Sequence, residues 1–357
     1  MPWKRVSVLL TGVGAPGTRG TIYSLRKNAD GADVRIIGTD LREDAVGRHW
    51  VSEFSTLPPP ESGGYIDEVN RLCARHGADM VLPQTTRETM ALSASLQKVR
   101  VPVAVSAGAA VSRANNKFEL LRTFEGLDLP HPRYFMVRSM ADLAKRARQL
   151  GYPHSPVAVK PPVSFGSRGF RVLRGESTWD RRRFLAEKPS AVETTLEELG
   201  KVLGRGSGSR FPELLVTEFM PGVEYSVDAF VGEKAQVALP RRRDEIVNGI
   251  SFRATVEDRE DVARYTLRAA RELGLRYAFG FQFKLDSDGV PKVLECNPRV
   301  QGTMVASLFG GVNVIWMAVK EALGDPPAAV RARPVAATFQ RFWGGLGVAD
   351  GSLIDEI

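Results

Sequence analysis

The sequence predicts an α/β fold that opens with a parallel sheet. Residues 5–10 form a compact apolar run, the glycine-rich segment 11–20 follows, and a helical pattern comes next. Further apolar runs at 34–40 and 80–83 repeat the alternation of strand and helix. Such alternation indicates a parallel sheet that carries helices on its faces.

The glycine segment has the spacing of a dinucleotide-binding loop. Gly12, Gly14 and Gly17 match the pattern Gly-x-Gly-x-x-Gly, and Asp40 stands 23 residues after Gly17 at the end of the next strand. Pro16 lies inside the loop, and many folds use glycine at such a turn. NAD binding is therefore one interpretation, and a glycine-loop domain of another kind is the alternative.

Polar residues 84–88 follow the strand at 80–83, at the end of the sheet where open α/β folds bind ligands. The alternative role for this segment is a helix N-terminal cap, which is the better interpretation for Thr85 or Thr86. The remaining residues are candidates to line a substrate pocket; they are Gln84, Arg87 and Glu88.

The segment from Phe279 to Arg299 predicts a β-hairpin. Phenylalanines at every second position from Phe279 to Phe283 alternate with small or polar residues, which is typical of a strand with one buried face. Residues 286–289 (Asp-Ser-Asp-Gly) supply the reversal, and a second strand ends at Arg299, which adds a cation.

Three oxygen-bearing side chains are expected to converge on this hairpin. With a turn at 286–289, Gln282 lies opposite Val293, and Glu295 shares a face with Asn297. Pro291 could shift this register by one residue. A carboxylate with two amide oxygens suits Mg²⁺. The alternative is an edge hairpin with a solvated polar face.

A strand over 156–160 ends in Lys160, and a Gly/Ser loop at 164–169 and another strand follow. A lysine that faces such a loop can hold phosphate oxygens by its charge, together with the N–H groups of the loop. The spacing is not that of a Walker motif. The alternative is a solvated lysine before a mobile hairpin.

A further strand, 214–218, ends in Glu218 and runs through the turn 219–222 into a strand that begins near Glu224. An acid at a strand end beside a turn can read an adenine edge, and the next acid can bind ribose hydroxyls. The alternative is that both acids are only exposed surface groups.

The composition indicates two or three packed units, since 43% of the 357 residues are hydrophobic. The formal charge of +8 comes mostly from scattered arginines and favours anionic small molecules over nucleic acid as ligands. No apolar run reaches the roughly 20 residues of a membrane span, so we expect a cytoplasmic protein without membrane partners. Cys73 and Cys296 are expected to be small buried side chains.

Taken in order, these residues resemble the ATP-grasp superfamily, and within it the stand-alone relatives of the carbamoyl-phosphate synthase large subunit. The resemblance covers about residues 1–325, includes the family's glycine-loop (pre-ATP-grasp) domain, and so disfavours the NAD interpretation. It is carried by Lys117, Lys160, the loop 164–169, residues 218–222, Glu224, Gln282 and the stretch 295–299 (Glu-Cys-Asn-Pro-Arg).

The resemblance implies ATP as a ligand together with Mg²⁺, as a pair of ions, with Mn²⁺ as an alternative. Catalytic roles fall to Lys160, Arg243, Arg253 and Arg299. The metal ligands would be Gln282, Glu295 and Asn297. Contacts to ATP are implied for Lys117, Lys160, Ser164, Gly166, Ser167, Gly169, Glu218, Phe219, Met220 and Glu224.

The implied activity is that of an ADP-forming ligase, which activates a carboxylate as an acyl phosphate and joins it to an amine. Two alternatives remain open at this stage: a bicarbonate-activating enzyme and a non-catalytic ATP sensor. No glutaminase domain is visible, so carbamoyl phosphate is not the expected product. The expected partners are small carboxylates and amines, and a homodimer is one assembly the chain could form.

The implied architecture is a Rossmann-like N-terminal domain followed by two α+β lobes that clasp ATP. A short apolar run at 101–105 is expected to be the fourth strand that closes the first domain. The expected boundaries are 1–110 for that domain, 111–325 for the ATP-grasp domain, with a small lobe over 111–220 and a larger lobe over 221–325, and 326–357 for a C-terminal strand and tail.

Overall fold

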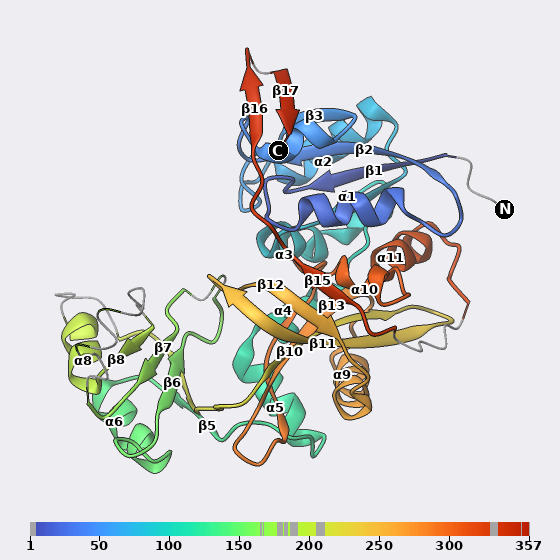
Figure 1. The fold of residues 1–357 in the computed structure, drawn as a ribbon. Coiled ribbons are helices and arrows are strands. Elements are labelled where there is room, and N and C mark those ends of the chain that lie inside the picture. Colours follow the sequence, from blue (N-terminus) through green and yellow to red (C-terminus); the bar gives the residue numbers. More distant parts are fainter. Residues whose placement is uncertain are drawn as a thin grey trace. The chain divides into compact units, whose positions relative to one another are not determined.

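A computed structural model of the chain describes residues 5–164, 166, 168–176, 181, 185, 192–204, 211–328, 335–350 and 352–356. The chain forms two compact units, and Figure 1 follows its course by colour. Unit 1 consists of residues 1–115, 224–282 and 295–357, and unit 2 of residues 116–223 and 283–294. The domain boundaries expected from the sequence stay predictions.

Unit 1 begins with a parallel sheet, as the strand and helix alternation predicts. Its strand order is β3-β2-β1-β4, and every neighbouring pair is parallel. The strands are β1 (Arg5–Thr11), β2 (Asp33–Asp40), β3 (Glu53–Thr56) and β4 (Met80–Pro83), and the helices are α1 (Thr18–Arg26), α2 (Tyr65–His76), α3 (Thr86–Ala94) and α4 (Gly108–Asn115), with short 3₁₀ turns η1 (Val46–Trp50) and η2 (Leu96–Lys98).

The expected strand at 101–105 is wrong. This run makes only an isolated parallel bridge between Val103 and Val81. The Val81 N–H donates to the Pro102 carbonyl, and the Ala104 N–H donates to the Val81 carbonyl. Pro102 has no N–H to extend this ladder. The fourth strand of the sheet is instead β3, which the sequence pattern does not predict.

The second sheet has the strand order β14-β13-β10-β11-β12-β15. Its strands β10 (Glu224–Val231), β11 (Gln236–Val247) and β12 (Ile250–Val256) form an antiparallel meander. The remaining elements are β13 (Tyr277–Leu285), β14 (Pro291–Asn297), β15 (Thr338–Gln340), α9 (Glu260–Leu273), α10 (Ala306–Phe309) and α11 (Val314–Ala322).

The C-terminal part holds more structure than one strand and a tail. β15 pairs with β12, and a separate two-stranded hairpin follows, formed by β16 (Leu346–Ala349) and β17 (Ser352–Glu356). This hairpin is red in Figure 1. A salt bridge of 2.5 Å joins Glu356 of β17 to Arg19 of α1.

One hydrophobic core joins the two sheets of unit 1. Val6, Val8 and Leu10 of β1 belong to the same buried cluster as Phe230 of β10 and Trp316 of α11. Burial also explains why β13 departs from the expected alternation, since every residue from Ala278 to Phe281 is buried. This stretch of the sheet is covered on both faces, so the small residues between the phenylalanines are buried as well.

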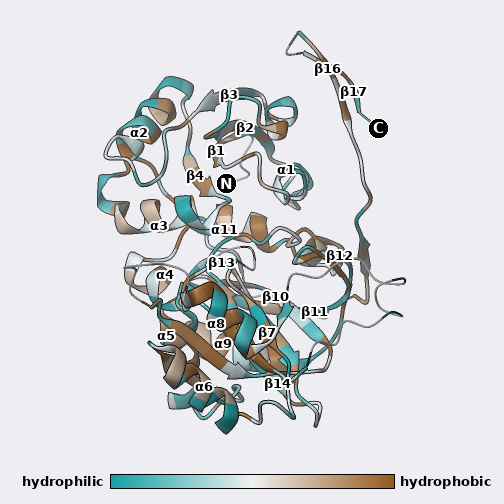
Figure 2. Cartoon of the chain, turned by 90° about the vertical axis from the view of Figure 1, so that its left-hand side faces the viewer, coloured by the Kyte–Doolittle hydropathy of each residue, from teal (hydrophilic) through white to brown (hydrophobic). Residues whose placement is uncertain are grey.

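Unit 2 has a five-stranded sheet of order β5-β9-β6-β7-β8. Its cluster of buried residues includes Val157 and Val159 of β6 with Leu214 and Val216 of β9. Figure 2 shows hydrophilic residues on its outer helix α6. The elements are β5 (Tyr134–Val137), β6 (Val157–Lys160), β7 (Arg171–Leu173), β8 (Glu193–Thr194), β9 (Leu214–Glu218), α5 (Lys117–Gly126), α6 (Met140–Gln149) and α8 (Leu196–Gly204).

Among the described residues, none of the helices is long and apolar enough to cross a membrane.

Candidate functional site

Lys160 ends the buried strand β6 in unit 2. The apolar residues before it hold β6 between β9 and β7, so the lysine is carried into a buried position. Its Nζ donates to the carbonyl of Leu294 at 3.2 Å. Leu294 immediately precedes Glu295 in the chain. A buried ammonium is therefore tied to the backbone of the strand that carries the expected metal ligands.

Lys117 is the second buried lysine of unit 2. It is the first residue of α5. The N-cap residue of this helix, Asn116, accepts hydrogen bonds through its side chain from the N–H groups of Phe118 and Glu119. The Lys117 Nζ donates to the Ser164 carbonyl at 3.3 Å and lies 3.5 Å from the Ser164 hydroxyl. The structure thus brings Lys117 to the start of the predicted phosphate loop.

The loop itself contains two glycines in the left-handed region, Gly166 at φ +60° and Gly169 at φ +77°. A Cβ on Gly169 would stand 2.7 Å from the Pro161 ring, so both conformation and space favour glycine there. Ser167, also expected in this loop, lies outside the described residues.

Glu218 at the end of β9 is held by two cations. Its carboxylate accepts from Lys292 Nζ at 2.6 Å and from Arg133 Nε at 2.9 Å, and Lys292 also lies 3.2 Å from Asp286. Burial raises the pKa of Glu218, but the hydrogen bonds from Lys292 and Arg133 outweigh that effect and keep the pKa below its usual value. The carboxylate is therefore ionised and firmly oriented.

The turn after β9 contains the other residues expected near adenine. Met220 is buried, and the Phe219 ring has the Lys284 ammonium 5.6 Å and the Arg174 guanidinium 5.9 Å from its centroid. The Gly222 N–H donates to the Leu285 carbonyl at 2.9 Å, which fixes the turn against the hairpin. An apolar wall beside backbone groups can accept a nucleobase.

Glu295 and Asn297 stand on one face of β14, as predicted. The Asn297 Nδ2 donates to Glu295 Oε1 at 3.3 Å, so a carboxylate and an amide lie side by side. The third expected ligand, Gln282 on β13, is partly buried, and its side chain makes no hydrogen bond within the described part of the chain. Oxygen donors of this kind fit Mg²⁺.

The predicted metal ligands include two amides and only one carboxylate. Searched over the described residues, the structure holds no group of three or more His, Cys, Asp or Glu side chains that could bind a metal ion. Any ion on this hairpin would therefore depend on the amide oxygens and on phosphate oxygens from a ligand.

The hairpin turn is one residue longer than predicted. The Asp286 N–H donates to the Val290 carbonyl at 3.0 Å, and Gly289 takes φ +77° inside the turn. At the turn the pairing is therefore moved by one residue from the register expected for Gln282 and Val293, the shift that Pro291 allows. The shared face of the two ligands on β14 does not depend on this register, because they are two residues apart.

Arg299, just beyond β14, is anchored at two points. Its Nε donates to the Thr86 hydroxyl at 2.8 Å, and its Nη1 donates to the Val300 carbonyl at 2.9 Å. Burial lowers the pKa of Arg299, and the nearby Glu295 carboxylate opposes that shift.

Cys296 lies between Glu295 and Arg299 in the chain and is buried. Burial raises the pKa of its thiol well above the usual value, as expected for an inert side chain.

Arg243 and Glu224 form an ion pair in unit 1. The remaining donors of Arg243 reach the Ser251 hydroxyl at 2.8 Å and the Gly249 carbonyl at 2.6 Å. The guanidinium is thus occupied in orienting Glu224. Arg253 on β12 is exposed, so of the three arginines it is the one that faces solvent.

The polar residues after β4 have different structural settings. Thr85 caps α3 in a capping box with Glu88, which confirms the cap interpretation for Thr85. Burial raises the pKa of Glu88 to about 7. Gln84 donates to the Thr21 hydroxyl at 2.7 Å, and Arg87 forms an exposed ion pair with Glu61.

Asp40 holds the glycine loop through hydrogen bonds to its carboxylate. Its carboxylate accepts from the Gly14 N–H at 2.7 Å and from the Arg42 N–H at 3.0 Å. Because this carboxylate already accepts hydrogen bonds from the loop, it is poorly placed to bind the hydroxyls of a ribose. This arrangement disfavours the NAD interpretation.

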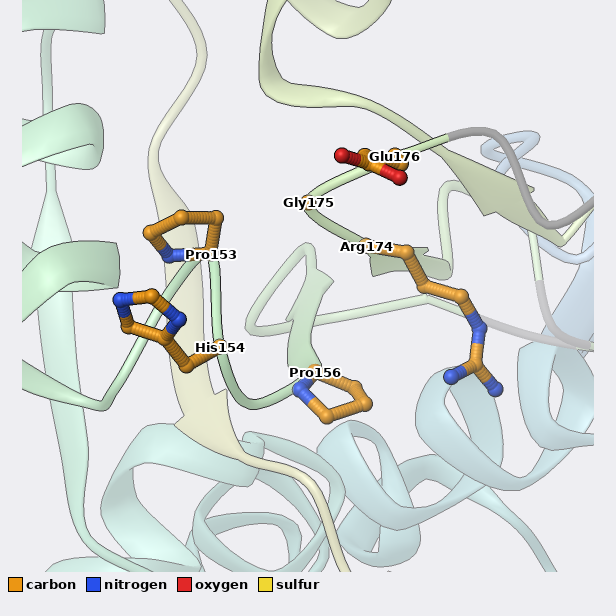
Figure 3. A pocket seen from close by; sticks show the side chains of 6 residues that line it. All are labelled: Pro153, His154, Pro156, Arg174, Gly175 and Glu176. Atoms are coloured by element: carbon orange, nitrogen blue, oxygen red, sulfur yellow. The ribbon is translucent and has the colours of Figure 1, made fainter.

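Figure 3 shows a hollow on the surface of unit 2. In that view the Arg174 side chain extends away from Pro153 and His154. None of the expected site residues lines the hollow; its lining residues are Pro153, His154, Pro156, Arg174, Gly175 and Glu176.

Several polar partners escape prediction from the sequence. Thr86 contacts Arg299 across 213 positions, and Lys292 joins Glu218 from the hairpin. The pattern of the strand does not mark Lys292, because it stands three positions before Glu295 and a period of two places it on the other face. No local signal marks Thr86, because a helix start accounts for it equally well.

Residues 210–341 match the family model described as "ATP-grasp in the biosynthetic pathway with Ter operon". The chain is also similar to the carbamoyl phosphate synthase large chain of Pyrococcus furiosus, with 24% identity over 242 residues, covering 65% of this chain and 21% of that protein. The chain therefore spans about a fifth of the length of that relative.

Two solved structures share most of the architecture. N5-carboxyaminoimidazole synthetase from Staphylococcus aureus, in complex with ADP, has a TM-score of 0.68 at 14% identity, covering 92% of this chain and 80% of that one. L-amino acid ligase from Bacillus licheniformis has a TM-score of 0.64 at 16% identity, covering 96% of this chain and 79% of that one. At these identities the likeness concerns the fold.

Proposed function

We propose that this chain is an ATP-grasp enzyme and an ADP-forming ligase, which activates a carboxylate as an acyl phosphate and joins it to an amine. The family-model match over residues 210–341 and the similarity of the fold support this proposal. The observation that carries the proposal is the hydrogen bond from Lys160 to the Leu294 carbonyl. It fixes a buried ammonium on the strand that continues into Glu295, where phosphoryl transfer needs positive charge and metal ligands close together.

The phosphates of the nucleotide would be held by two buried lysines and by the loop that follows β6. Lys160 and Lys117 supply buried positive charge for phosphate oxygens, and Ser164 with the N–H groups at Gly166 and Gly169 forms the loop beside them. These groups would position the phosphates and stabilise their charge. Phosphoryl transfer requires little covalent participation by the protein, so positioning and charge are sufficient.

The nucleoside would lie against the turn after β9 and the acid at the start of β10. Phe219 and Met220 offer an apolar surface and backbone groups, while the oriented carboxylates of Glu218 and Glu224 accept hydrogen bonds from an exocyclic amine and from ribose hydroxyls. The pairing of Glu224 with Arg243 keeps that carboxylate in one direction.

Glu295, Asn297 and Gln282 are the residues that would hold Mg²⁺, which when bound neutralises charge on the phosphate oxygens. Arg299 is the arginine best suited to the reacting carboxylate or the departing phosphate. Arg243 already binds three acceptors, whereas the Nη2 of Arg299 donates to none within the described residues.

The carboxylate must be activated because oxide is a very poor leaving group. Phosphorylation replaces it by phosphate and divides one difficult step into two easier ones. The carboxylate oxygen attacks the γ-phosphorus, ADP leaves, and the amine then attacks the acyl carbon and displaces phosphate. The amine loses its proton in this second step.

The test is a screen for ADP release. The purified chain is incubated with MgATP and with pools of small carboxylates, amines or both, and bicarbonate alone forms a separate arm. ADP release that requires one carboxylate and one amine, and that Glu295→Gln abolishes, supports the proposal. ADP release with bicarbonate alone favours the carboxylating alternative, and ATP binding without ADP release in every pool points to a sensor.

A further inference from the structure

The hydroxyl of Thr86 has a partner that the start of α3 does not require. Thr85 is the N-cap of this helix: its side chain accepts from the Glu88 N–H, and the Glu88 side chain accepts from the Thr85 N–H. This reciprocal arrangement already satisfies the helix start. Thr86, the next residue, is 7% exposed and is not needed as a cap.

Thr86 instead accepts a hydrogen bond from Arg299 Nε at 2.8 Å. Both residues belong to unit 1. A second bond, from Arg299 Nη1 to the Val300 carbonyl at 2.9 Å, holds the guanidinium at another nitrogen. Because a guanidinium is planar, fixing Nε and Nη1 also fixes the direction in which Nη2 points.

We propose that Thr86 is a positioning residue, which aims the guanidinium of Arg299 at the phosphoryl group that is transferred. This inference rests on the proposed function. Without the Thr86 acceptor the buried Nε–H has no partner, and the nearby Glu295 carboxylate, which already interacts with Arg299 electrostatically, is the competing acceptor. The N-terminal domain thereby contributes to catalysis through one hydroxyl.

The test compares Thr86→Val, which keeps the side-chain shape but removes the acceptor, with Thr86→Ser, which keeps the acceptor. Thr89→Val is the matched control, because Thr89 is also a buried threonine of α3 and donates to the Thr85 carbonyl at 2.8 Å. The probe is MgADP with or without aluminium fluoride, a mimic of the transferred phosphoryl group. Calorimetry gives both affinities, and circular dichroism confirms folding.

We expect Thr86→Val to weaken binding of the fluoride complex about tenfold while binding of MgADP alone changes less than about twofold. Thr86→Ser should restore the wild-type affinity, and Thr89→Val should retain it. If Thr86→Val does not fold, Thr86→Ala serves as the second variant.

Equal affinities of wild type and Thr86→Val for the fluoride complex would overturn the inference and leave the proposed function standing. An equal loss for both ligands would also overturn it, since the role would then be structural. A wild-type chain that binds MgADP but gains nothing from aluminium fluoride would contradict the proposed function together with the inference.

Discussion

Lys160 donates through its ammonium to the backbone carbonyl of Leu294, 134 residues further along the chain. We predict that Lys160→Met, which keeps the length of the side chain but removes the charge, lowers the kcat of ADP formation by about 100-fold or more. The fold should persist, because methionine keeps the length and the apolar stem of this buried side chain. Steady-state kinetics and thermal unfolding measure both effects.

The control for this variant is Lys145→Met on the exposed face of α6. It removes the same charge from an exposed side chain and should keep the wild-type rate. A Lys160→Met enzyme with a normal rate would remove Lys160 from the site.

The second prediction concerns the predicted metal ligands. Glu295→Gln keeps the shape of the side chain but removes the carboxylate beside Asn297, so ADP formation should fall below detection while the unfolding temperature changes little. Added Mg²⁺ should not restore the rate. Asp288→Asn, in the exposed turn of the same hairpin, should behave as wild type. Turnover by Glu295→Gln near the wild-type rate would show that this carboxylate does not bind the ion.

The third prediction is a dependence of stability on pH that arises from Glu88. Burial raises the pKa of this carboxyl from 4.5 to about 7 in the folded chain. The folded state therefore holds the proton more tightly, and this contribution is complete below pH 4.5 and is lost as the pH rises through about 7. The loss amounts to about 3 kcal/mol, from the pKa difference between the two states.

Glu88→Gln keeps the side-chain cap but cannot ionise, so it should remove that part of the pH dependence. Urea unfolding at pH 5 and pH 8 measures the free energy of unfolding of both proteins. The wild type should lose more stability than the variant between these pH values. Parallel pH profiles would show that Glu88 has an ordinary pKa.

The fourth prediction concerns the contact between Gly17 and Gly302. A Cβ on Gly17 would stand 2.5 Å from the Gly302 Cα, which is backbone and cannot rotate away. Gly17→Ala should therefore lower the free energy of unfolding by about 1–3 kcal/mol. Gly63→Ala has nothing within 4 Å of the new methyl group and should change stability by less than about 0.5 kcal/mol. Equal stabilities of the two variants would mean that the backbone yields at Gly17.

Much of the fold is readable from local patterns. The strands β1, β2 and β4, the helix start at Asn116 and the hairpin around Gly289 each have apolar periodicity or turn residues that act locally. The prediction of a strand at 101–105 was wrong because strand formation depends on neighbouring strands that are distant in sequence. Here Val103 makes only an isolated bridge to Val81. The full burial from Ala278 to Phe281 likewise depends on how elements cover the sheet.

For the same reason, the sequence predicts some residues of the candidate site and not the contacts that orient them. Lys160, Glu295 and Asn297 follow from strand ends and from spacing by two, which are local. The contact of Arg299 with Thr86 depends on tertiary packing across 213 positions, so no window of sequence contains it. The ion pair between Arg243 and Glu224 also depends on tertiary packing, so the sequence alone does not predict that Glu224 occupies this guanidinium.

If the carboxylate is activated by transfer of the γ-phosphoryl group, one of its oxygen atoms must leave with the phosphate, and isotope labelling can follow that atom. The carboxylate substrate found in the ADP-release screen is labelled with ¹⁸O in its carboxyl group, and the products are analysed by ³¹P NMR and mass spectrometry. We expect ADP as the nucleotide product and one ¹⁸O atom in each released phosphate. AMP with pyrophosphate, or unlabelled phosphate during confirmed amide formation, would contradict it.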